Sequence, residues 1–493
     1  MLDTLDTAQF EGDLKRRLHV RHLIMLSVGG TIASGFFLFS GSAINIAGPS
    51  VVFAYAIAGV ISLAVMACLA EMAVTRRVAG SFAIFAQETM GHLPGFLTGW
   101  NYWLAWVMGA ATESVAAGTY FHVFVPSVPI WVVAGVITLI EMIVNLVGVL
   151  FMGEYEFILS TIKLVGLALF IVIGGVAIFT SSLHTVGVSG YTGHGGLFPN
   201  GVGAVGAALL PVFFAYVGIE LVGVTAEESV HPERDVPRSL IWTALIVAGL
   251  FILASVVLLG VISWTKAGTS SSPFVDGFNA MNLTAIGAVF NWVVILASLS
   301  SVDGGLYTAS RMMFAISREG YLPKVLSRTH PKRKTPNPAI FVTSLCIFVG
   351  AVLAYFFPNS AYVFVASLSS FGFLYAWLMI SISQPLYRIQ KGPEYVRNLK
   401  WKTPLYPLTP IVAIIAVLAA LIGQFFAPGS TPIGPINIPG SGAVVVIGIV
   451  WTVIWAVYYL LIARGFGHGH EWRASQGRGQ PPQPGAAPSA GSS

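Results

Sequence analysis

The sequence predicts an all-α polytopic membrane protein, because few charges, many apolar residues and regularly spaced apolar blocks occur in one chain. Only 9% of the 493 residues are Asp, Glu, Lys or Arg, against about 25% in soluble domains, while 56% are hydrophobic. A chain of this length could not cover a water-facing surface with so few charges. The apolar residues gather in blocks of roughly 20, the length that an α-helix needs to cross a ~30 Å hydrocarbon core.

Polar breaks divide the chain into twelve predicted transmembrane helices. With a cytoplasmic N-terminus, 23 of the 25 Lys and Arg residues fall on the cytoplasmic side, Lys266 falls outside and Lys163 falls within a span. Removing one span would reverse every later loop and destroy this asymmetry, so we expect twelve spans with both termini in the cytoplasm. The predicted spans are 22–45, 50–74, 96–123, 128–150, 155–180, 202–226, 239–263, 284–315, 338–357, 360–386, 406–427 and 442–463.

The two ends of the chain differ from this apolar body. Residues 1–21 are polar and lack the apolar stretch of a signal peptide, so we expect a cytoplasmic tail. Residues 464–493 become rich in Gly, Pro, Ser, Ala and Gln, which predicts a disordered cytoplasmic tail. His468 and His470 in that tail could hold a metal weakly, but we attribute their spacing to chance and expect no metal site. Residues 22–463 are then a single transmembrane domain.

Five ionisable residues fall inside predicted spans, where a charge costs about 2.5–3.5 kcal/mol on insertion scales. Each is a candidate for a substrate or ion pathway, the alternative being a structural pair inside the bundle. They are Glu113, Glu141, Lys163, Glu220 and Asp303, in spans three, four, five, six and eight.

Other acidic residues are expected to be structural or solvated. For Glu141 we favour a structural role, because Asn145 follows one helical turn later. Five glutamates fall at the cytoplasmic ends of spans, where we expect solvation or pairing with loop arginines. They are Glu71, Glu154, Glu156, Glu227 and Glu228.

Two predicted spans contain helix breaks at corresponding positions. Residues 29–35 in the first span are G-G-T-I-A-S-G, and a glycine inside a helix costs roughly 0.8–1.0 kcal/mol relative to alanine. The sixth span contains Pro211 and then F-A-Y-V-G-I-E at 214–220, where proline removes a hydrogen bond and Gly218 loosens the next turn. The two spans are five apart, as expected if spans 1–5 and 6–10 are inverted repeats that each begin with a broken helix.

Unwound backbone at membrane depth predicts a binding site where the two breaks meet. Free N–H groups at a half-helix N-terminus attract a carboxylate and free carbonyls accept from an ammonium, so the pair suits a zwitterionic amino acid. Close packing by small residues explains the first-span glycines equally well on their own, but the matching sixth-span break favours a site. The candidate substrate-binding residues are Thr31, Ile32, Ala33, Ser34, Gly35, Phe214, Ala215, Val217 and Gly218.

These segments resemble motifs of the amino acid permeases of the amino acid–polyamine–organocation superfamily. Residues 30–35 are similar to that family's G-x-I-G-[ST]-G, with Ala33 replacing the middle glycine, and residues 214–220 resemble F-[AS]-[FY]-x-G-x-E. Residues 154–163 resemble the E-x-E-F…I-K pattern of the bacterial amino acid transporter branch. Residues 300–312 resemble S-x-x-N-[SG]-G-L-Y-x-x-S-R-M, with Asp303 where the family has Asn. The resemblance runs in order from about residue 15 to 463.

The resemblance implies a LeuT-type fold, with spans 1–10 as the core and two peripheral helices, in the plasma (inner) membrane. It implies substrate contacts from Thr31, Ser34 and Gly35 and from the backbone carbonyls of Phe214 and Val217, with Phe214 as a lid. Lys163 would fill the position that a sodium ion holds in sodium-coupled relatives.

We therefore expect a secondary active transporter that carries an L-amino acid into the cell together with protons, by alternating access. An amino acid exchanger that is not coupled to protons is the alternative. Lys163 is the candidate proton carrier, because protonation of a buried amine responds to water access and to nearby carboxylates. Glu220 would link substrate occupancy to protonation or to the inner gate. Asp303 would either strengthen this linkage or neutralise Lys163 as a structural pair.

The sequence leaves the substrate side chain open. Glu113 could face that side chain and favour a cationic amino acid, or it could serve helix packing. Trp100, Trp103 and Trp106 are interpreted as packing or interfacial residues. No H-E-x-x-H, G-x-S-x-G or G-x-x-x-x-G-K-[ST] motif occurs, so we expect no enzyme and no ATP-driven transport. A channel is disfavoured by the paired breaks and the lysine inside a span. The expected partners are an amino acid and the lipid bilayer, without cofactor or nucleic acid, and a monomer suffices.

Overall fold

Each of the twelve predicted apolar blocks coincides with a helix, or with a run of shorter helices, in the computed structural model. The structure describes residues 20–74, 81–180, 187, 189–224, 229, 231–268, 270, 272–357, 361–426, 430–433, 436–439 and 442–463. The predicted tails, Glu227 and Glu228 lie outside these ranges, apart from Val20 and Arg21. The described part of the chain is a helical bundle with one antiparallel pair of short strands, β1 (Ser430–Ile433) and β2 (Ile436–Pro439).

Ten long helices form the bundle, and shorter ones connect them. The long helices are α5 (Val51–Ala73), α7 (His92–Phe124), α8 (Ile130–Val147), α9 (Val149–Thr180), α13 (Pro232–Val261), α16 (Thr284–Arg318), α17 (Asn337–Phe356), α18 (Ala361–Asn398), α19 (Leu408–Phe426) and α20 (Gly442–Tyr458). The connecting helices are α6 (Ser81–Met90), α10 (Ser189–Thr192), α14 (Trp264–Ala267) and α15 (Pro273–Ala280).

The first and sixth blocks are both interrupted. The first consists of α2 (Val20–Thr31), α3 (Ser34–Phe37) and α4 (Phe39–Ala47), with Ala33 in an extended conformation. The sixth consists of α11 (Gly203–Tyr216) and α12 (Leu221–Val224). Gly218 lies between these two helices with φ 105°, a conformation that favours glycine. Pro211 lies inside α11, so the break occurs after Tyr216 rather than at the proline.

Nine helical stretches of the described chain are long and apolar enough to cross a membrane. The first and sixth blocks do not qualify as separate spans because their breaks leave short pieces. The 33-residue α7 is also not among the nine, since Glu113 and many Gly, Trp and Tyr residues lower its mean hydropathy. The count of twelve spans therefore stays a prediction. The nine are Ser34–Ala73, Ile130–Val147, Phe151–Thr180, Arg234–Val261, Thr284–Arg318, Asn337–Phe356, Phe364–Asn398, Leu408–Phe425 and Val444–Ile462.

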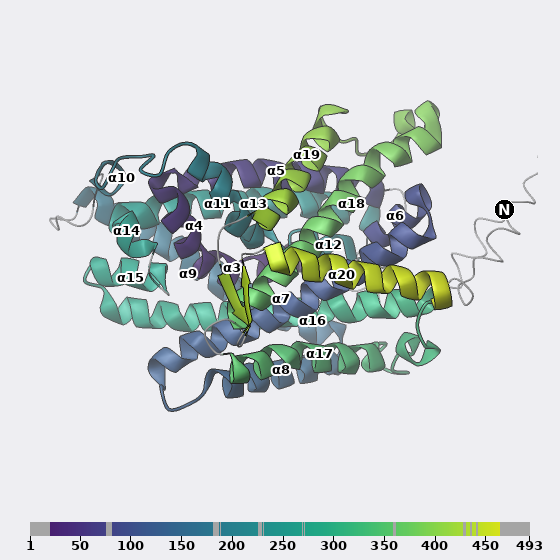
Figure 1. Ribbon diagram of the computed structural model, residues 1–493, viewed down its shortest axis with the longest axis horizontal. Coiled ribbons are helices and arrows are strands. Elements are labelled where there is room, and N and C mark those ends of the chain that lie inside the picture. The colour runs from purple at the N-terminus through teal and green to yellow at the C-terminus, as the bar shows by residue number, and fades with distance from the viewer. Residues whose placement is uncertain are drawn as a thin grey trace, which may run out of the picture.

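Helix α7 lies at the centre of the bundle and packs against α16, α18, α6 and α8. Figure 1 shows α7 and α16 running together through the middle, with α8 and α17 paired along the lower edge. Small residues allow close packing: a Cβ atom on Gly372 of α18 would lie 2.5 Å from the carbonyl oxygen of Asn101 in α7. This central position brings Glu113 of α7 between α16 and α18.

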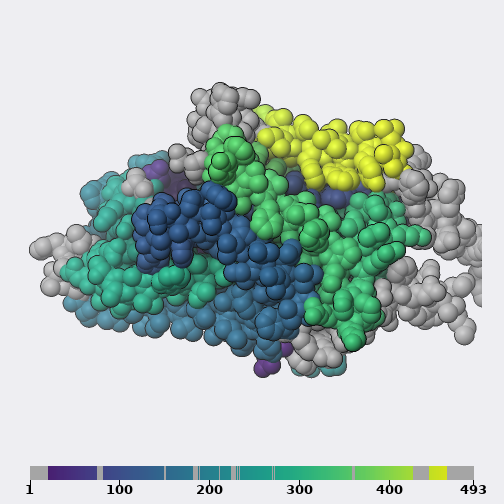
Figure 2. All heavy atoms as spheres, turned by 90° about the horizontal axis from the view of Figure 1, so that it is seen from below, coloured from purple at the N-terminus to yellow at the C-terminus, as the bar shows by residue number. Residues whose placement is uncertain are grey.

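The periphery of the bundle is apolar. Figure 2 shows α20 as a ridge along one surface of the molecule. Its side chains Val453 and Ile454 are more than half exposed, as are Ile143 of α8 and Phe179 of α9. An outward-facing apolar surface of this extent is what a helix bundle presents to lipid.

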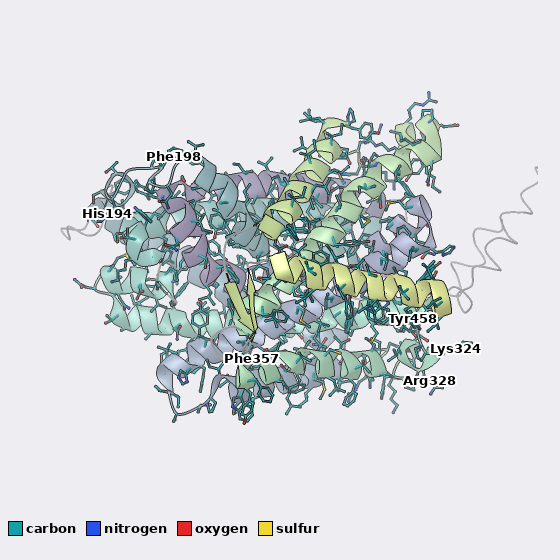
Figure 3. All side chains as sticks on the ribbon, viewed as in Figure 1. His194, Phe198, Lys324, Arg328, Phe357 and Tyr458 are labelled. Atoms are coloured by element: carbon teal, nitrogen blue, oxygen red, sulfur yellow. The ribbon has the colours of Figure 1, made fainter. Side chains whose placement is uncertain are left out.

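The two ends of the bundle carry different loops. His194 and Phe198 lie at one end, together with α10, α14 and α15 (Figures 1 and 3). Lys324 and Arg328 lie at the opposite end, in the basic loop between α16 and α17 (Figure 3). The basic loop and the loop that contains His194 therefore face opposite sides of the bundle.

A buried ion pair joins the end of α5 to α18. The Arg388 side chain donates from Nε to Glu71 Oε1 at 2.6 Å and from Nη2 to Glu71 Oε2 at 2.5 Å. The Glu71 carboxylate also accepts from the Gln384 side chain and from the Thr403 backbone N–H. Glu71 is thus paired with an arginine, as expected, but it is buried instead of solvated.

Candidate functional site

The two broken segments pack directly against each other. The Ser27 hydroxyl of α2 donates to the carbonyl oxygens of Gly218 and Ile219, at 3.0 and 2.9 Å. A Cβ atom on Gly218 would lie 2.9 Å from the Gly30 carbonyl and from Thr31 Oγ1. Glycine is therefore required at position 218 both by its positive φ and by the closeness of the first-span backbone.

Phe214 covers the other side of the first-span break. A Cβ atom on Gly35 would lie 3.1 Å from the Phe214 ring and 3.2 Å from its carbonyl oxygen. The ring also lies 5.1 Å from that of Phe39, measured between ring centroids. Phe214 therefore stands against the unwound segment, where a lid over a bound ligand would have to be.

Glu113 binds the start of the helix that follows the first-span break. Its Oε2 accepts from the Ser34 backbone N–H at 3.1 Å, and its Oε1 accepts from the Ser34 hydroxyl at 2.8 Å. Tyr362 of α18 donates to the same hydroxyl oxygen at 3.1 Å. A carboxylate at a helix N-terminus satisfies an N–H group that lacks a partner within the helix.

A small void of about 20 Å³ lies between the two breaks. This volume holds about one water molecule, so the candidate site has no room for an amino acid in this structure. Five predicted substrate-site residues line it, whereas Ile32, Ala33, Ser34, Ala215 and Gly218 do not. The lining residues are Gly30, Thr31, Gly35, Trp106, Gly109, Glu113, Phe214, Val217, Ser301, Ser369 and Phe373.

Sequence reasoning missed several of these lining residues. The sequence predicts a packing or interfacial role for Trp106, and Ser301, Ser369 and Phe373 are not among the predicted site residues. Ser301 lies two residues before Asp303 in a recognised motif, which was an available signal. Ser369 and Phe373 come from α18, where no local pattern in the sequence indicates a site.

Lys163 of α9 is fully buried and contacts the first-span break. Its Nζ donates to the Gly29 carbonyl oxygen at 2.5 Å and to the Ala297 carbonyl oxygen of α16 at 3.3 Å. The Ser301 hydroxyl donates to the same Gly29 carbonyl at 3.0 Å. The lysine therefore connects α9, α2 and α16 at the point where the first span is broken.

Asp303 is turned towards α8 rather than towards Lys163. Its Oδ1 accepts from Asn145 Nδ2 at 2.6 Å, and within the described chain it forms no ion pair with Lys163. Glu141, on the same helix as Asn145, accepts from the Tyr155 hydroxyl at 2.9 Å. The structure thus groups Asp303 with Asn145 and α8, and the alternative in which Asp303 neutralises Lys163 as a structural pair is not met.

The expectation that Glu156 is solvated or paired with a loop arginine is wrong. Glu156 is 1% exposed, and its Oε1 accepts from the hydroxyls of Ser160 and Ser300. The cause is that α9 begins at Val149, so Glu156 lies two turns inside the helix. It is seven residues before Lys163 and shares its helix face, which is a signal that the sequence offered. Glu154, by contrast, is 58% exposed, and its Oε1 lies 3.3 Å from His22 Nε2.

Glu220 connects the sixth-span break to two other helices. Its Oε1 accepts from the Tyr102 hydroxyl of α7, and its Oε2 accepts from the Trp377 indole of α18, each at 3.1 Å. The Gly218 backbone N–H also donates to Oε2, at 3.2 Å. The carboxylate is fully buried, so any movement of the break changes the partners of Glu220.

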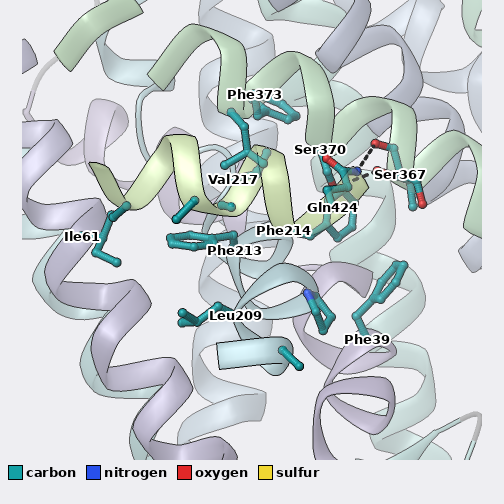
Figure 4. Close-up of a pocket in the computed structure, with 18 of the residues that line it drawn as sticks. Phe39, Ile61, Leu209, Phe213, Phe214, Val217, Ser367, Ser370, Phe373 and Gln424 are labelled. Atoms are coloured by element: carbon teal, nitrogen blue, oxygen red, sulfur yellow. Dashed lines mark hydrogen bonds between the residues drawn. The ribbon is translucent and has the colours of Figure 1, made fainter. Parts of the chain in front are cut away.

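A larger cavity of about 720 Å³ adjoins the small void. It lies among α4, α5, α11, α18 and α19, and Phe214, Val217 and Phe373 line both spaces (Figure 4). Its lining is mostly apolar, with Gln424 held by a hydrogen bond to the Ser367 carbonyl at 3.1 Å (Figure 4). Phe214 and Phe373 therefore separate an apolar chamber from the polar groups around the break.

Two interlocked helix breaks around a small void, with ionisable side chains buried beside them, indicate a membrane transporter. Residues 22–467 match the sequence model of the amino acid permease family, and the chain belongs to this family, within the amino acid–polyamine–organocation superfamily. The resemblance seen in its motifs is thereby confirmed. The chain is a multi-pass membrane permease rather than an enzyme, and an amino acid is the substrate class that the family implies.

Three relatives from Bacillus subtilis (strain 168) support this assignment. The amino-acid permease RocC is 37% identical over 433 residues, which is 85% of this chain and 90% of RocC. The amino-acid permease RocE is 35% identical over 436 residues, 86% of this chain and 92% of RocE. The uncharacterized amino acid permease YtnA is 33% identical over 454 residues, 91% of this chain and 95% of YtnA. The family match, which runs over residues 22–467, includes both breaks.

Replacing Gly29 by alanine should destabilise the permease. A Cβ atom there would overlap Glu156 Oε1 and Ser160 Oγ, both held in the buried contact between α9 and α2. Overpacking of this kind costs about 1–3 kcal/mol, so the melting temperature of purified Gly29→Ala in detergent should fall by several degrees.

Gly249→Ala in α13 is the matched control, because a Cβ atom on Gly249 has no neighbouring atom within 4 Å. Removing a glycine from a helix interior there should leave the melting temperature unchanged or slightly raised. Equal melting temperatures for the two variants would contradict the tight contact at Gly29.

Proposed function

We propose that this permease is a secondary active transporter that carries an L-amino acid into the cell by alternating access, coupled to protons. Family membership supports the substrate class. The observation that carries the coupling is the buried Lys163 ammonium on the carbonyl of Gly29, at the first-span break. It supports protons as the coupling ion, because the same contact can be made or lost as the amine gains or loses a proton.

For the substrate, we assign the two ends of the zwitterion to the two breaks. The carboxylate would bind the N–H groups of Ser34 and Gly35 and the Thr31 hydroxyl. The ammonium would bind the carbonyls of Phe214 and Val217, with the Phe214 ring as lid. Ile32, Ala33, Ala215 and Gly218 would shape the backbone instead of touching the ligand. The void between the breaks has to widen for this, since about 20 Å³ does not hold an amino acid.

For coupling, we assign Lys163 the role of proton carrier. The protonated amine holds Gly29 of α2 and Ala297 of α16 together, and the neutral amine would release α2 for the opposite conformation. Glu220 would transmit the state of the sixth-span break to α7 and α18 through Tyr102 and Trp377. Asp303 would act through Asn145 of α8, since it does not pair with the lysine.

We further propose twelve spans in the plasma membrane, with two inverted five-helix repeats, two peripheral helices and both termini in the cytoplasm. The two breaks lie in the first and sixth predicted spans, and this separation of five spans supports the repeat. The excess of basic residues at the Lys324 end supports the orientation (Figure 3).

Thiol labelling tests the orientation. In a variant lacking Cys68 and Cys346, an added cysteine at His194→Cys should react with a membrane-impermeant maleimide in intact cells. A cysteine at Lys324→Cys should react only after the cells are opened, because the basic loop faces the cytoplasm. Both positions are exposed at their ends of the bundle. The reverse labelling pattern would invert the proposed topology.

A stability screen tests the substrate class. Each common L-amino acid is added to the purified permease, and the melting temperature is recorded against equal concentrations of glucose. A ligand present at 100 times its Kd stabilises the folded protein by about 2.7 kcal/mol, so the true substrate should raise the melting temperature by several degrees. If none of them does so and none is taken up by proteoliposomes, the proposed substrate class is wrong.

Lys163→Ala tests the coupling and separates symport from the alternative, amino acid exchange. Without the amine, proteoliposomes should no longer accumulate the labelled substrate when a pH gradient is imposed. Counterflow of labelled against unlabelled substrate without a gradient should persist, because the substrate groups are intact. Lys332→Ala, in the exposed basic loop, should accumulate substrate like the wild type. Undiminished gradient-driven accumulation by Lys163→Ala would refute its role as proton carrier, whereas counterflow without any gradient-driven accumulation by the wild type itself would favour exchange.

A further inference from the structure

We propose that Glu113 occupies the substrate's carboxylate position in the empty permease, and that an arriving amino acid displaces it and pairs with it. The inference rests on the proposed substrate role of the first-span break. It adds an internal competitor to that site, and it predicts a preference for zwitterions over simple carboxylates.

The geometry shows that the start of α3 accepts a carboxylate, because one is bound there. The two oxygens of Glu113 take separate donors, the Ser34 backbone N–H at 3.1 Å and the Ser34 hydroxyl at 2.8 Å. The Tyr362 hydroxyl of α18 donates to the Ser34 hydroxyl oxygen at 3.1 Å and so holds the Ser34 side chain in place. This two-donor arrangement, here called the Ser34 cradle, matches the two oxygens of any carboxylate.

Glu113 and a substrate carboxylate cannot hold the Ser34 cradle together. Each of its two donors has one hydrogen to give, and both are engaged by Glu113. Glu113 also lines the void of about 20 Å³ together with Thr31, Gly35 and Phe214, so no room remains beside it. Binding at the cradle therefore requires the Glu113 side chain to leave it.

Charge decides what can replace Glu113. A buried carboxylate that loses its donors costs several kcal/mol unless a cation pairs with it. Lys163 forms no ion pair with Glu113 among the described residues, and its ammonium is bound to the Gly29 and Ala297 carbonyls. An amino acid supplies its own ammonium, so its carboxylate can take the cradle while the released Glu113 pairs with the positive end. A monocarboxylate brings a second negative charge and no cation, and is excluded.

The test compares amino acids with analogues that lack only the amine. The probes are L-alanine with propanoate, L-phenylalanine with 3-phenylpropanoate, and L-histidine with 3-(imidazol-4-yl)propanoate. Binding to the purified full-length permease is measured by calorimetry and by thermal shift. For each amino acid that binds to the wild type, we expect that its desamino analogue does not bind.

In Glu113→Gln the cradle is held by a neutral amide of the same shape. The desamino analogue of each bound amino acid should then bind at least about tenfold more tightly than it binds the wild type, because no buried anion has to be displaced. Glu394→Gln removes an exposed charge on α18 and should leave the wild-type pattern unchanged.

Glu113→Asp is the second variant, in case the amide substitution lowers stability. Its shorter side chain reaches the cradle poorly but can still pair with an ammonium, so the amino acid should bind more tightly while the desamino analogue stays excluded. If neither variant changes the ratio of amino acid to desamino affinity, Glu113 is only a structural cap and the proposal fails. If no amino acid binds even the wild type, the failure lies with the proposed function.

Discussion

The packing of two unwound segments against each other is the constraint on which the rest of the structure depends. Inside a membrane every free backbone N–H and C=O group needs a partner from the protein. Here Ser27 donates hydrogen bonds to the Gly218 and Ile219 carbonyls. Lys163 and Ser301 donate to the Gly29 carbonyl. Glu113 accepts from the Ser34 N–H group, and Glu220 accepts from the Gly218 N–H group. Glu113 of α7, Lys163 of α9 and Ser301 of α16 lie where they do because the first break requires them.

The same contacts give the breaks their capacity to switch. A continuous helix satisfies its own backbone, so moving it changes few polar partners. A broken helix borrows its partners from its neighbours, and each of them constrains where the half-helix can go. Gly29 is bound by groups from α9 and α16, and Gly218 by groups from α2 and Glu220. On the proposed mechanism, a change in one donor, such as loss of a proton from Lys163, alters which position of the half-helix is most stable.

The breaks and the long helices could be predicted from the sequence because local composition determines them. The side-chain contacts between helices could not, because they depend on how each helix is rotated about its axis. Glycines 29, 30, 35 and 218 foretold both breaks, and blocks of apolar residues foretold every long helix. The burial of Glu156 and the pairing of Asp303 with Asn145 depend on which face of a helix meets which neighbour. The contacts involved join residues far apart in the chain: Glu156 and Ser300 are 144 residues apart, and Asn145 and Asp303 are 158 residues apart. Pro211 lies near the break but is not its position. Helix α11 accommodates the proline, and the chain unwinds only where Gly218 permits a positive φ.

Glu113 shows how one residue serves both the fold and the site. An unfilled Ser34 cradle would leave a buried N–H group and a hydroxyl without acceptors, at a cost of about 1–3 kcal/mol each. Glu113 removes that cost in the empty permease, so a substrate carboxylate gains nothing merely by replacing it. On the mechanism proposed here, the net free energy of binding comes from what the substrate adds, which is an ammonium for the Phe214 and Val217 carbonyls and for the displaced Glu113. The selectivity for amino acids then follows from the amine, although the carboxylate is the group that opens the site.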